Sequence, residues 1–150
     1  MYRLYEFWLH RQLDKEHAPN HVGLILDGNR RWAREHGLDS PWFGHHKGAK
    51  KVMDVMRILW EAGVKVCTLY AFSVENFQRH NDEVTEIMKI AKEKFGEVID
   101  NPDVHRHQVR IKAIGRVELL PKDVQEAIKA AEDETTQYNK HILNVAIGYS

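Results

Sequence analysis

The chain has 150 residues, of which 43% are hydrophobic and 29% are charged, a balance typical of one soluble globular domain. Its 22 basic and 22 acidic residues cancel, so bulk charge gives no reason to expect nucleic acid binding. Any anionic ligand must therefore be held by a local cluster of cations. The lone cysteine, Cys67, excludes an internal disulfide. No apolar stretch has the length of a membrane span and no signal peptide is visible, so we expect a cytoplasmic protein.

The amino-terminal residues carry apolar side chains at helical spacing. Tyr2, Tyr5 and Trp8 fall on one face, which predicts an amphipathic helix over residues 2–13, within an amino-terminal segment 1–20. This face either packs on its own domain, which we favour, or makes peripheral contact with a membrane surface.

Predicted strands and helices alternate along the rest of the chain. Short apolar runs predict strands over residues 22–26, 64–72, 109–114 and 142–147. Apolar stripes predict helices over residues 29–37, 46–62, 81–98 and 121–137. Asn81 or Asp82 is the expected cap of the third of these helices, and Pro121 is the expected first residue of the fourth.

This alternation predicts a single α/β domain over residues 1–150, with a parallel sheet flanked by helices on both faces. The sequence stops at Tyr149 and Ser150, directly after the fourth predicted strand. A loop or helix normally follows such a strand, so the domain looks truncated there.

The segment Asp27–Trp32 follows the first predicted strand and combines an acid, a glycine and two arginines. Gly28 allows a tight turn, and the helix that follows presents unpaired N–H groups that attract anions. Arg30 and Arg31 have the wrong sign for an isolated helix start, so they suggest a phosphate or diphosphate partner. Mg²⁺ would then bridge Asp27 and the phosphate, because Mg²⁺ commonly uses one or two carboxylates plus phosphate oxygens.

A simpler interpretation of this segment is an Asp-Gly turn before a solvated basic helix start. A phosphatase with a nucleophilic aspartate is a second alternative. Such enzymes usually have an acid two positions after the nucleophile, and Asn29 stands there instead.

The segment Phe43–Gly48 opens the second predicted helix and contains His45, His46 and Lys47. A helix start with these side chains suits an anion, or the side chains are simply solvated. Adjacent histidines also suggest zinc, but a tetrahedral site needs further ligands, which only distant histidines of the chain would supply.

The segment Ser73–Arg79 follows the second predicted strand and gathers a hydroxyl, a carboxylate, an amide and a guanidinium. Loops at strand ends often bind ligands. The alternative is a polar turn before a helix, and the residue types alone leave both interpretations open.

Three blocks of the sequence together resemble the cis-prenyltransferases, which include undecaprenyl diphosphate synthase and its archaeal and eukaryotic relatives. The blocks are His21–Ala33, with the run Asp27-Gly28-Asn29-Arg30-Arg31-Trp32; Gly44-His45 with Gly48-Ala49; and Thr68–Arg79, with Ser73, Glu75-Asn76-Phe77 and Arg79. Shorter matches follow at Ile114-Gly115 and Leu143–Ala146. The resemblance covers residues 21–149 in order and implies the undecaprenyl diphosphate synthase-like fold.

The resemblance implies an enzyme that condenses isopentenyl diphosphate with an allylic prenyl diphosphate, such as farnesyl or geranylgeranyl diphosphate. The product would be a cis polyprenyl diphosphate for lipid carrier synthesis, and the cofactor Mg²⁺. It also implies a homodimer. The apolar face of the third helix would line a tunnel for the growing chain or form core, or both, and its residues are Val84, Ile87, Met88, Ala91 and Phe95.

The resemblance also implies residue roles. Asp27 would hold Mg²⁺ and help to ionise the allylic diphosphate. Asn76 stands where the family places a residue tied to proton removal from isopentenyl diphosphate; an amide is a poor base, so diphosphate oxygens are the alternative acceptor. The implied substrate-binding residues are Gly28, Asn29, Arg30, Arg31, Trp32, His45, Ser73, Val74, Glu75, Phe77 and Arg79.

The sequence departs from the family pattern in two places. The loop 38–42 lacks an arginine that many bacterial members have there, and the last block stops at Ser150. The family continues with arginines and a serine that bind isopentenyl diphosphate and with a second metal-binding glutamate. We therefore expect weak or absent turnover from these 150 residues alone. A non-catalytic partner subunit and a different phosphate-binding α/β enzyme are the alternatives.

Overall fold

The computed structural model of the chain describes residues 17–40 and 42–150. The helix predicted over residues 2–13 lies outside the described residues. The elements are β1 (His21–Ile25), α2 (Asn29–Glu35), α3 (Phe43–Glu61), β2 (Val66–Ser73), the 3-10 helix η2 (Val74–Gln78), α4 (Asn81–Glu97), α5 (Pro102–His107), β3 (Val109–Ile114), the 3-10 helix η3 (Val117–Leu119), α6 (Lys122–Glu134) and β4 (His141–Tyr149).

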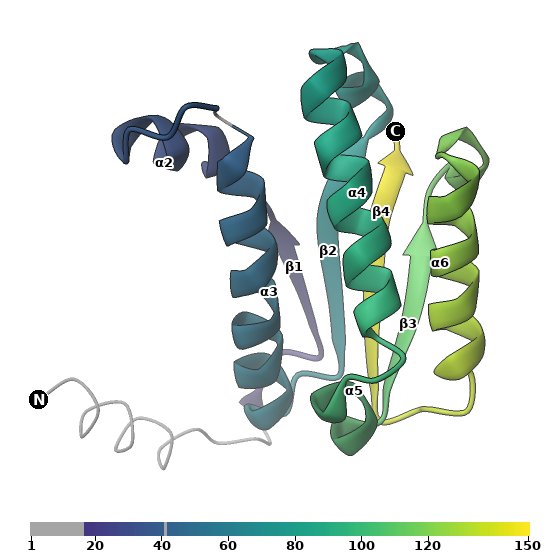
Figure 1. Ribbon diagram of the computed structural model, residues 1–150. Coiled ribbons are helices and arrows are strands. Elements are labelled where there is room, and N and C mark those ends of the chain that lie inside the picture. The colour runs from purple at the N-terminus through teal and green to yellow at the C-terminus, as the bar shows by residue number, and fades with distance from the viewer. Residues whose placement is uncertain (1–16, 41) are drawn as a thin grey trace, which may run out of the picture.

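The four strands form one parallel sheet in the order β1-β2-β4-β3, as Figure 1 shows. The prediction of a parallel sheet with intervening helices is confirmed. In the central register Leu69 of β2 lies between Leu24 of β1 and Val145 of β4. The register of β2 against β4 shifts between Tyr70 and Ser73, at the carboxyl end of β2. Such an irregularity re-aims side chains, and here it leaves both Phe72 and Ser73 buried.

The helices α3, α4 and α6 all lie on the viewer's side of the sheet in Figure 1. The core lies between them and the sheet, with buried residues that include Met56, Trp60, Leu69, Phe72, Phe95, Ile111, Val124, Ile128, Leu143 and Ile147. The opposite face carries no helix of the described residues. Within the described residues, helices therefore cover one face of the sheet, whereas the sequence predicts helices on both faces.

The outer edge of β3 is covered by α6. The Thr135 hydroxyl accepts a hydrogen bond from the N–H of Ile111 at 3.0 Å, and the Glu132 carboxylate accepts one from the N–H of Ala113 at 2.8 Å. Thr135 is fully buried and also donates to the carbonyl of Ala131. These side chains satisfy edge groups that would otherwise invite another strand.

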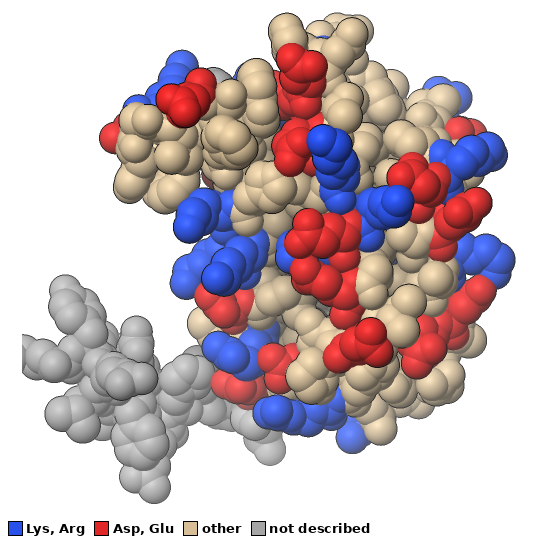
Figure 2. Space-filling model, viewed as in Figure 1, with Lys and Arg blue, Asp and Glu red and all other residues tan. Residues whose placement is uncertain are grey.

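The ends of several elements differ from the sequence predictions. The expected cap of α4 is wrong by a residue, because the ring of His80 accepts the N–H of Asp82 at 3.3 Å. Pro121 precedes α6 as its cap instead of opening it. The short helix α5 was not predicted; Asn101 caps it and Pro102 is its first residue. On the visible face, basic and acidic side chains are interspersed, as the zero net charge suggests (Figure 2).

Candidate active site

Two adjoining cavities lie where the carboxyl ends of β1 and β2 meet the starts of α2, α3 and α4. The first is polar, with a volume of about 150 Å³. The second is apolar, with a volume of about 340 Å³, and extends between α3 and α4. They share Leu26, Asp27, Asn29, His45 and Arg79 in their walls. The two cavities together therefore suit a ligand that has a polar head and an apolar tail.

Asp27 and Gly28 form the turn that brings the chain from β1 into α2. Gly28 has φ +87°, a left-handed conformation that residues with a Cβ rarely adopt. The Asp27 carboxylate accepts the N–H of Gly28 at 2.6 Å and lies 3.9 Å from the Arg31 guanidinium. The Asp27 side chain is 84% exposed, so its carboxylate is accessible to a ligand.

Asn29 explains the two glycines of the second sequence block. A Cβ on Gly44 would lie 1.9 Å from the Asn29 carbonyl oxygen, and one on Gly48 would lie 2.4 Å from the Asn29 side-chain oxygen. Both distances are far below contact, so only glycine allows α2 to start against α3 at this point. Between the two glycines, the His45 ring lies 3.5 Å from the Asn29 amide nitrogen.

Four of the nine residues that line the polar cavity are arginines. Arg30, Arg31 and Arg34 come from α2, and Arg79 comes from the segment after η2. Among the described residues that line it, Asp27 is the one carboxylate. A concave surface of this composition binds a highly charged anion through charge-assisted hydrogen bonds.

Glu83, which sequence analysis missed, lies behind this lining and holds three of its residues. Its carboxylate accepts a hydrogen bond from Arg79 at 3.0 Å and contacts His45 at 3.0 Å and Arg30 at 3.9 Å. Glu83 is 5% exposed. An ionised carboxylate is stable in the protein interior only when cationic or hydrogen-bonding partners compensate its charge, and these three residues do so. The one signal available in the sequence was the spacing of four residues between Arg79 and Glu83, although Arg79 precedes the helix.

Electrostatics keeps Glu83 ionised and His45 neutral. Burial by itself would raise the pKa of Glu83, but the His45 hydrogen bond and the charges of Arg79 and Arg30 together lower it below its ordinary value. Burial lowers the pKa of His45, and this outweighs the opposite effect of Glu83. A neutral His45 between Asn29 and a carboxylate donates to Glu83, which leaves its other ring nitrogen toward Asn29.

The loop after β2 is ordered by its own side chains. Ser73 and Asn76 form a capping box around η2, in which the Asn76 side-chain oxygen accepts the N–H of Ser73 at 3.1 Å. A hydrogen bond from Ser73 lowers the pKa of Glu75. Phe77 packs edge-on against Phe72 with ring centres 4.9 Å apart. Of the segment Ser73–Arg79, Asn76 and Arg79 reach the wall of the apolar cavity.

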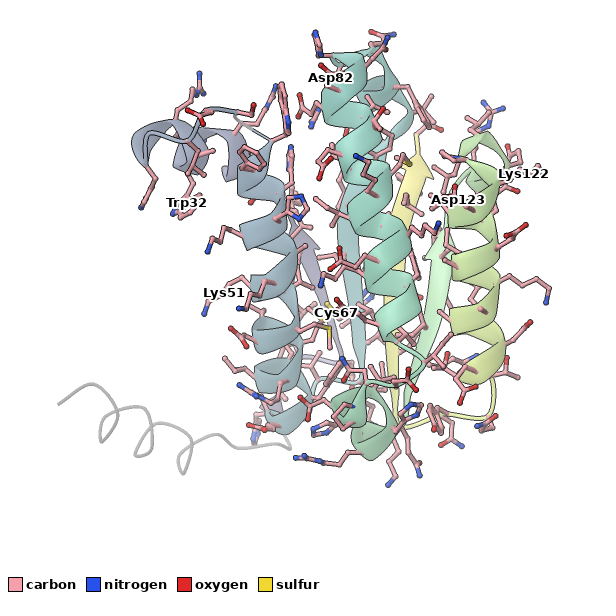
Figure 3. All side chains as sticks on the ribbon, in the orientation of Figure 1. Trp32, Lys51, Cys67, Asp82, Lys122 and Asp123 are labelled. Atoms are coloured by element: carbon pink, nitrogen blue, oxygen red, sulfur yellow. The ribbon has the colours of Figure 1, made fainter. Side chains whose placement is uncertain are left out.

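The apolar cavity runs along α4, between α3 and the sheet. Its walls come from α3, from the sheet and from α4, and they include Val52, Met53, Leu69, Ile87, Ile90, Ala91, Phe95, Leu143, Val145 and Ile147. Of the residues predicted to line a tunnel, Ile87, Ala91 and Phe95 are in this wall, whereas Val84 and Met88 are not. Cys67, labelled in Figure 3, projects from β2 toward the helices; burial raises its pKa to about 11, as expected of a core thiol.

The structure thus groups seven of the predicted site residues around the polar cavity: Asp27, Gly28, Asn29, Arg30, Arg31, His45 and Arg79. Trp32 lines neither cavity; its ring stacks on His36 at 4.2 Å, and Figure 3 shows it on α2, away from α4. Ser73, Val74, Glu75 and Phe77 also line neither cavity. The substrate roles of these residues stay predictions. Besides Glu83, the charged wall residues that the sequence analysis missed are Arg34, Lys94 and Glu97.

The polar cavity suits Mg²⁺ only together with a phosphorylated ligand. Within residues 17–40 and 42–150, no group of three or more His, Cys, Asp and Glu side chains is placed to hold a metal. The exposed Asp27 carboxylate, set among cations, supplies one oxygen donor group, and phosphate oxygens and water would complete the octahedron that Mg²⁺ requires. This donor set fits the ion.

The two adjacent histidines have separate carboxylate partners on α4. His45 contacts Glu83, and His46 contacts Glu86 at 2.6 Å. His46 therefore helps to join the starts of α3 and α4. In the described part of the chain, no helix is long and apolar enough to cross a membrane.

Comparison with known protein families gives the class to which this fold and site belong. Residues 25–150 match the model of the prenyltransferase family described as "Putative undecaprenyl diphosphate synthase". Because the match covers most of the chain, the chain belongs to this family.

Individual relatives support the same assignment. The chain is 48% identical over 147 residues to the tritrans,polycis-undecaprenyl-diphosphate synthase (geranylgeranyl-diphosphate specific) of Methanocaldococcus jannaschii, covering 98% of this chain and 52% of that protein. It is 47% identical to the synthase of the same name from Pyrococcus horikoshii, covering 99% of this chain and 56% of the relative. The chain therefore spans about half the length of the curated relatives it matches.

Two solved structures share the fold. A lavandulyl diphosphate synthase from Lavandula x intermedia, in complex with dimethylallyl diphosphate, superposes with a TM-score of 0.79 at 29% identity, over 88% of this chain and 56% of that one. A probable undecaprenyl diphosphate synthase from Campylobacter jejuni superposes with a TM-score of 0.68 at 27% identity, over 87% of this chain and 54% of that one.

Proposed function

We propose that this chain supplies the diphosphate-ionising part of a Mg²⁺-dependent cis-prenyltransferase. The reaction joins isopentenyl diphosphate to an allylic prenyl diphosphate and builds a cis polyprenyl diphosphate for lipid carrier synthesis. One observation carries the proposal: the polar cavity with its four arginines, from here on the cationic cavity, shares Asp27, Asn29, His45 and Arg79 with the apolar cavity. A diphosphate joined to a hydrocarbon chain has that shape and polarity.

The residues of the polar cavity suit departure of the diphosphate. When the allylic carbon–oxygen bond breaks, the diphosphate gains negative charge and the hydrocarbon becomes an allylic cation. Arg30, Arg31 and Arg79 stabilise the departing anion, with Arg30 and Arg79 held in place by Glu83. Mg²⁺ bound by Asp27 would neutralise charge on the phosphate oxygens. The apolar wall beside Asn76 excludes water, which would quench the cation.

Proton removal after the new bond forms is assigned to a diphosphate oxygen. The Asn76 side-chain oxygen already accepts the N–H of Ser73, so the amide presents its NH₂ group as a donor. That orientation suits holding a diphosphate oxygen near the reacting carbon. It does not suit a base, and an amide is a poor base in any case.

Geranylgeranyl diphosphate is the proposed primer. The curated relatives with the highest identities given above are named as specific for geranylgeranyl diphosphate. The homodimer and the peripheral membrane contact remain predictions that need measurements of mass and of vesicle binding.

The proposal is tested by incorporation of labelled isopentenyl diphosphate in the presence of Mg²⁺. The gene product at its natural length is compared with residues 1–150, and farnesyl with geranylgeranyl diphosphate as primer. We expect long products from the natural-length protein, with geranylgeranyl diphosphate preferred. If neither protein makes products although both bind the allylic diphosphate, the chain is a binding partner and the enzymatic proposal is wrong. Preference for a nucleotide over either primer would instead favour a different phosphate-binding enzyme.

A further inference from the structure

The cationic cavity has an inner part and an outer part. The inner part is the wall shared with the apolar cavity, formed by Leu26, Asp27, Asn29, His45 and Arg79. The outer part consists of the residues that line the cationic cavity alone, which are Gly28, Arg30, Arg31 and Arg34. A prenyl diphosphate that lies across both cavities has its carbon–oxygen bond at the inner part. Its first phosphate therefore lies there, and its distal phosphate extends toward the outer part.

Among the arginines of the outer part, Arg34 lies farthest along α2. It follows Arg30 by four residues, so the two side chains leave the same face of the helix. About 6 Å of helical rise separates them. In Figure 1, α2 leads from the end of β1 to the side away from α4. Arg34 is therefore placed on the side of the cationic cavity to which the distal phosphate points.

Arg34 also differs from the other arginines of this cavity in its charge partners. Arg30 and Arg79 lie 3.9 and 3.0 Å from the buried Glu83 carboxylate. Arg31 lies 3.9 Å from the one carboxylate of the cavity wall. In the part of the chain that the structure describes, Arg34 pairs with no carboxylate, and its side chain is exposed. Its guanidinium therefore keeps its charge and its N–H donors for a ligand.

We propose that Arg34 binds the distal phosphate of the allylic substrate and thereby makes the site select diphosphates over monophosphates. This inference rests on the proposed function. A prenyl monophosphate with its hydrocarbon in the apolar cavity has its single phosphate at the inner part, short of Arg34. A diphosphate extends one phosphate further, where a planar guanidinium donates two parallel hydrogen bonds to phosphate oxygens. This selection matters because a bound monophosphate would occupy the apolar cavity with a poorer leaving group.

The first test is equilibrium binding to the natural-length protein, with Mg²⁺ and without isopentenyl diphosphate, so that no product forms. Geranylgeranyl diphosphate and geranylgeranyl monophosphate are titrated into the wild type and Arg34→Gln at one ionic strength. We expect Arg34→Gln to weaken diphosphate binding by about 10-fold, the loss of one charge-assisted contact, and monophosphate binding by less than about twofold. Equal losses for the two ligands, or no loss for either, would overturn the inference.

Two further variants serve as controls. Arg57→Gln removes an exposed arginine of α3 that lines neither cavity, so its affinity for both ligands should stay within about twofold of the wild type. Arg34→Lys keeps the charge without the planar fork and should lose less affinity for the diphosphate than Arg34→Gln. A loss of diphosphate preference in Arg57→Gln as large as in Arg34→Gln would show an effect of net charge, and would overturn the role of Arg34.

Steady-state kinetics provide a second, independent measurement. In the natural-length protein, Arg34→Gln should raise the KM for geranylgeranyl diphosphate by about 10-fold and change kcat by less than about threefold, because the distal phosphate is bound before and after the carbon–oxygen bond breaks. An unchanged KM would contradict the inference and leave the proposed function intact. Absence of prenyl transfer in the wild type would overturn the proposed function, whereas a diphosphate preference that depends on Arg34 would still support the binding role.

Discussion

The cationic cavity and the apolar cavity share a wall but are built in different ways. The first comes largely from one short run, Asp27 to Arg31, completed by His45 and Arg79. The second is assembled from the sheet, α3 and α4, with residues as far apart in sequence as Val52 and Ile147. Recognition of a charged ligand group depends on a few individually placed side chains, whereas binding of a hydrocarbon chain depends on the total apolar surface of the cavity wall. Single changes should therefore be severe in the first cavity and graded in the second.

Replacing Asp27 should separate chemistry from folding most sharply. We expect Asp27→Ala in the natural-length protein to lower prenyl transfer by about 100-fold or more, because the proposed metal-binding carboxylate is lost. The melting temperature should change little, since the side chain is 84% exposed. Steady-state rates at saturating Mg²⁺ and thermal melting measure the two effects. Asp39→Ala, in an exposed loop, is the control, and a fully active Asp27→Ala protein would remove Asp27 from the mechanism.

Replacing Glu83 should damage folding and catalysis together. Glu83→Ala leaves Arg79, His45 and Arg30 without their shared carboxylate, and we expect a loss of about 2 kcal/mol in the free energy of unfolding. Prenyl transfer should fall by about 10-fold because the arginines lose their orientation. Urea unfolding and initial rates measure these losses. Glu83→Gln should lie between the wild type and Glu83→Ala.

Glu86→Gln provides the matched control for Glu83. It removes an α4 carboxylate that pairs with His46 and lines neither cavity. Its effect on prenyl transfer should be less than twofold. Equal rate losses in the Glu83 and Glu86 variants would mean that the link between α3 and α4 matters, and not the placement of the arginines.

Filling the apolar cavity should change the product and leave the first condensation intact. Ala91 lies in the cavity wall, so the larger ring of Ala91→Phe projects into space that the hydrocarbon would occupy. We expect products shorter by one or more five-carbon units, with the rate of the first condensation within about threefold, a change of less than 1 kcal/mol in barrier. Chromatography of the labelled products is the readout. Ala130→Phe, on the exposed side of α6, should leave product length unchanged.

Lowering the pH should reduce the free energy of unfolding, through small contributions from several residues. Burial lowers the pKa of His45 in the cationic cavity and of His141 at the amino-terminal end of β4, relative to the ordinary value of 6.5. Below about pH 6.5 the unfolded chain binds protons that the folded chain does not, so the free energy of unfolding falls as the pH falls. Glu83, whose pKa is lowered, adds a further loss below about its ordinary value of 4.5.

Urea unfolding of residues 1–150 at several pH values between 8 and 5 tests this sign. His141→Asn should flatten part of the pH dependence without affecting Mg²⁺-dependent chemistry, because His141 bonds to the Val64 carbonyl, remote from both cavities. Stability that increases from pH 7 to pH 5 would contradict the assignment of both histidines as neutral in the folded state.

The sequence by itself determined the features that depend on neighbours along the chain. The alternation of apolar runs gave the four parallel strands, because strand and helix periods are local properties. The span of β3 was predicted at both ends. The sequence also predicted an anion site at the run Asp27 to Arg31. This prediction was possible because the strand end, the glycine turn and the helix start follow one another directly in the chain.

Tertiary structure alone decided the contacts between distant segments. The pairing of Glu83 with His45 joins α4 to α3 across 38 residues, and no local pattern specifies it. The need for Gly44 and Gly48 arises from Asn29, whose backbone and side chain pack against them. Lys94 was not among the residues predicted to line a tunnel, yet it lines the apolar cavity. Periodicity reports which side of a helix faces inward; only packing determines which groups meet there.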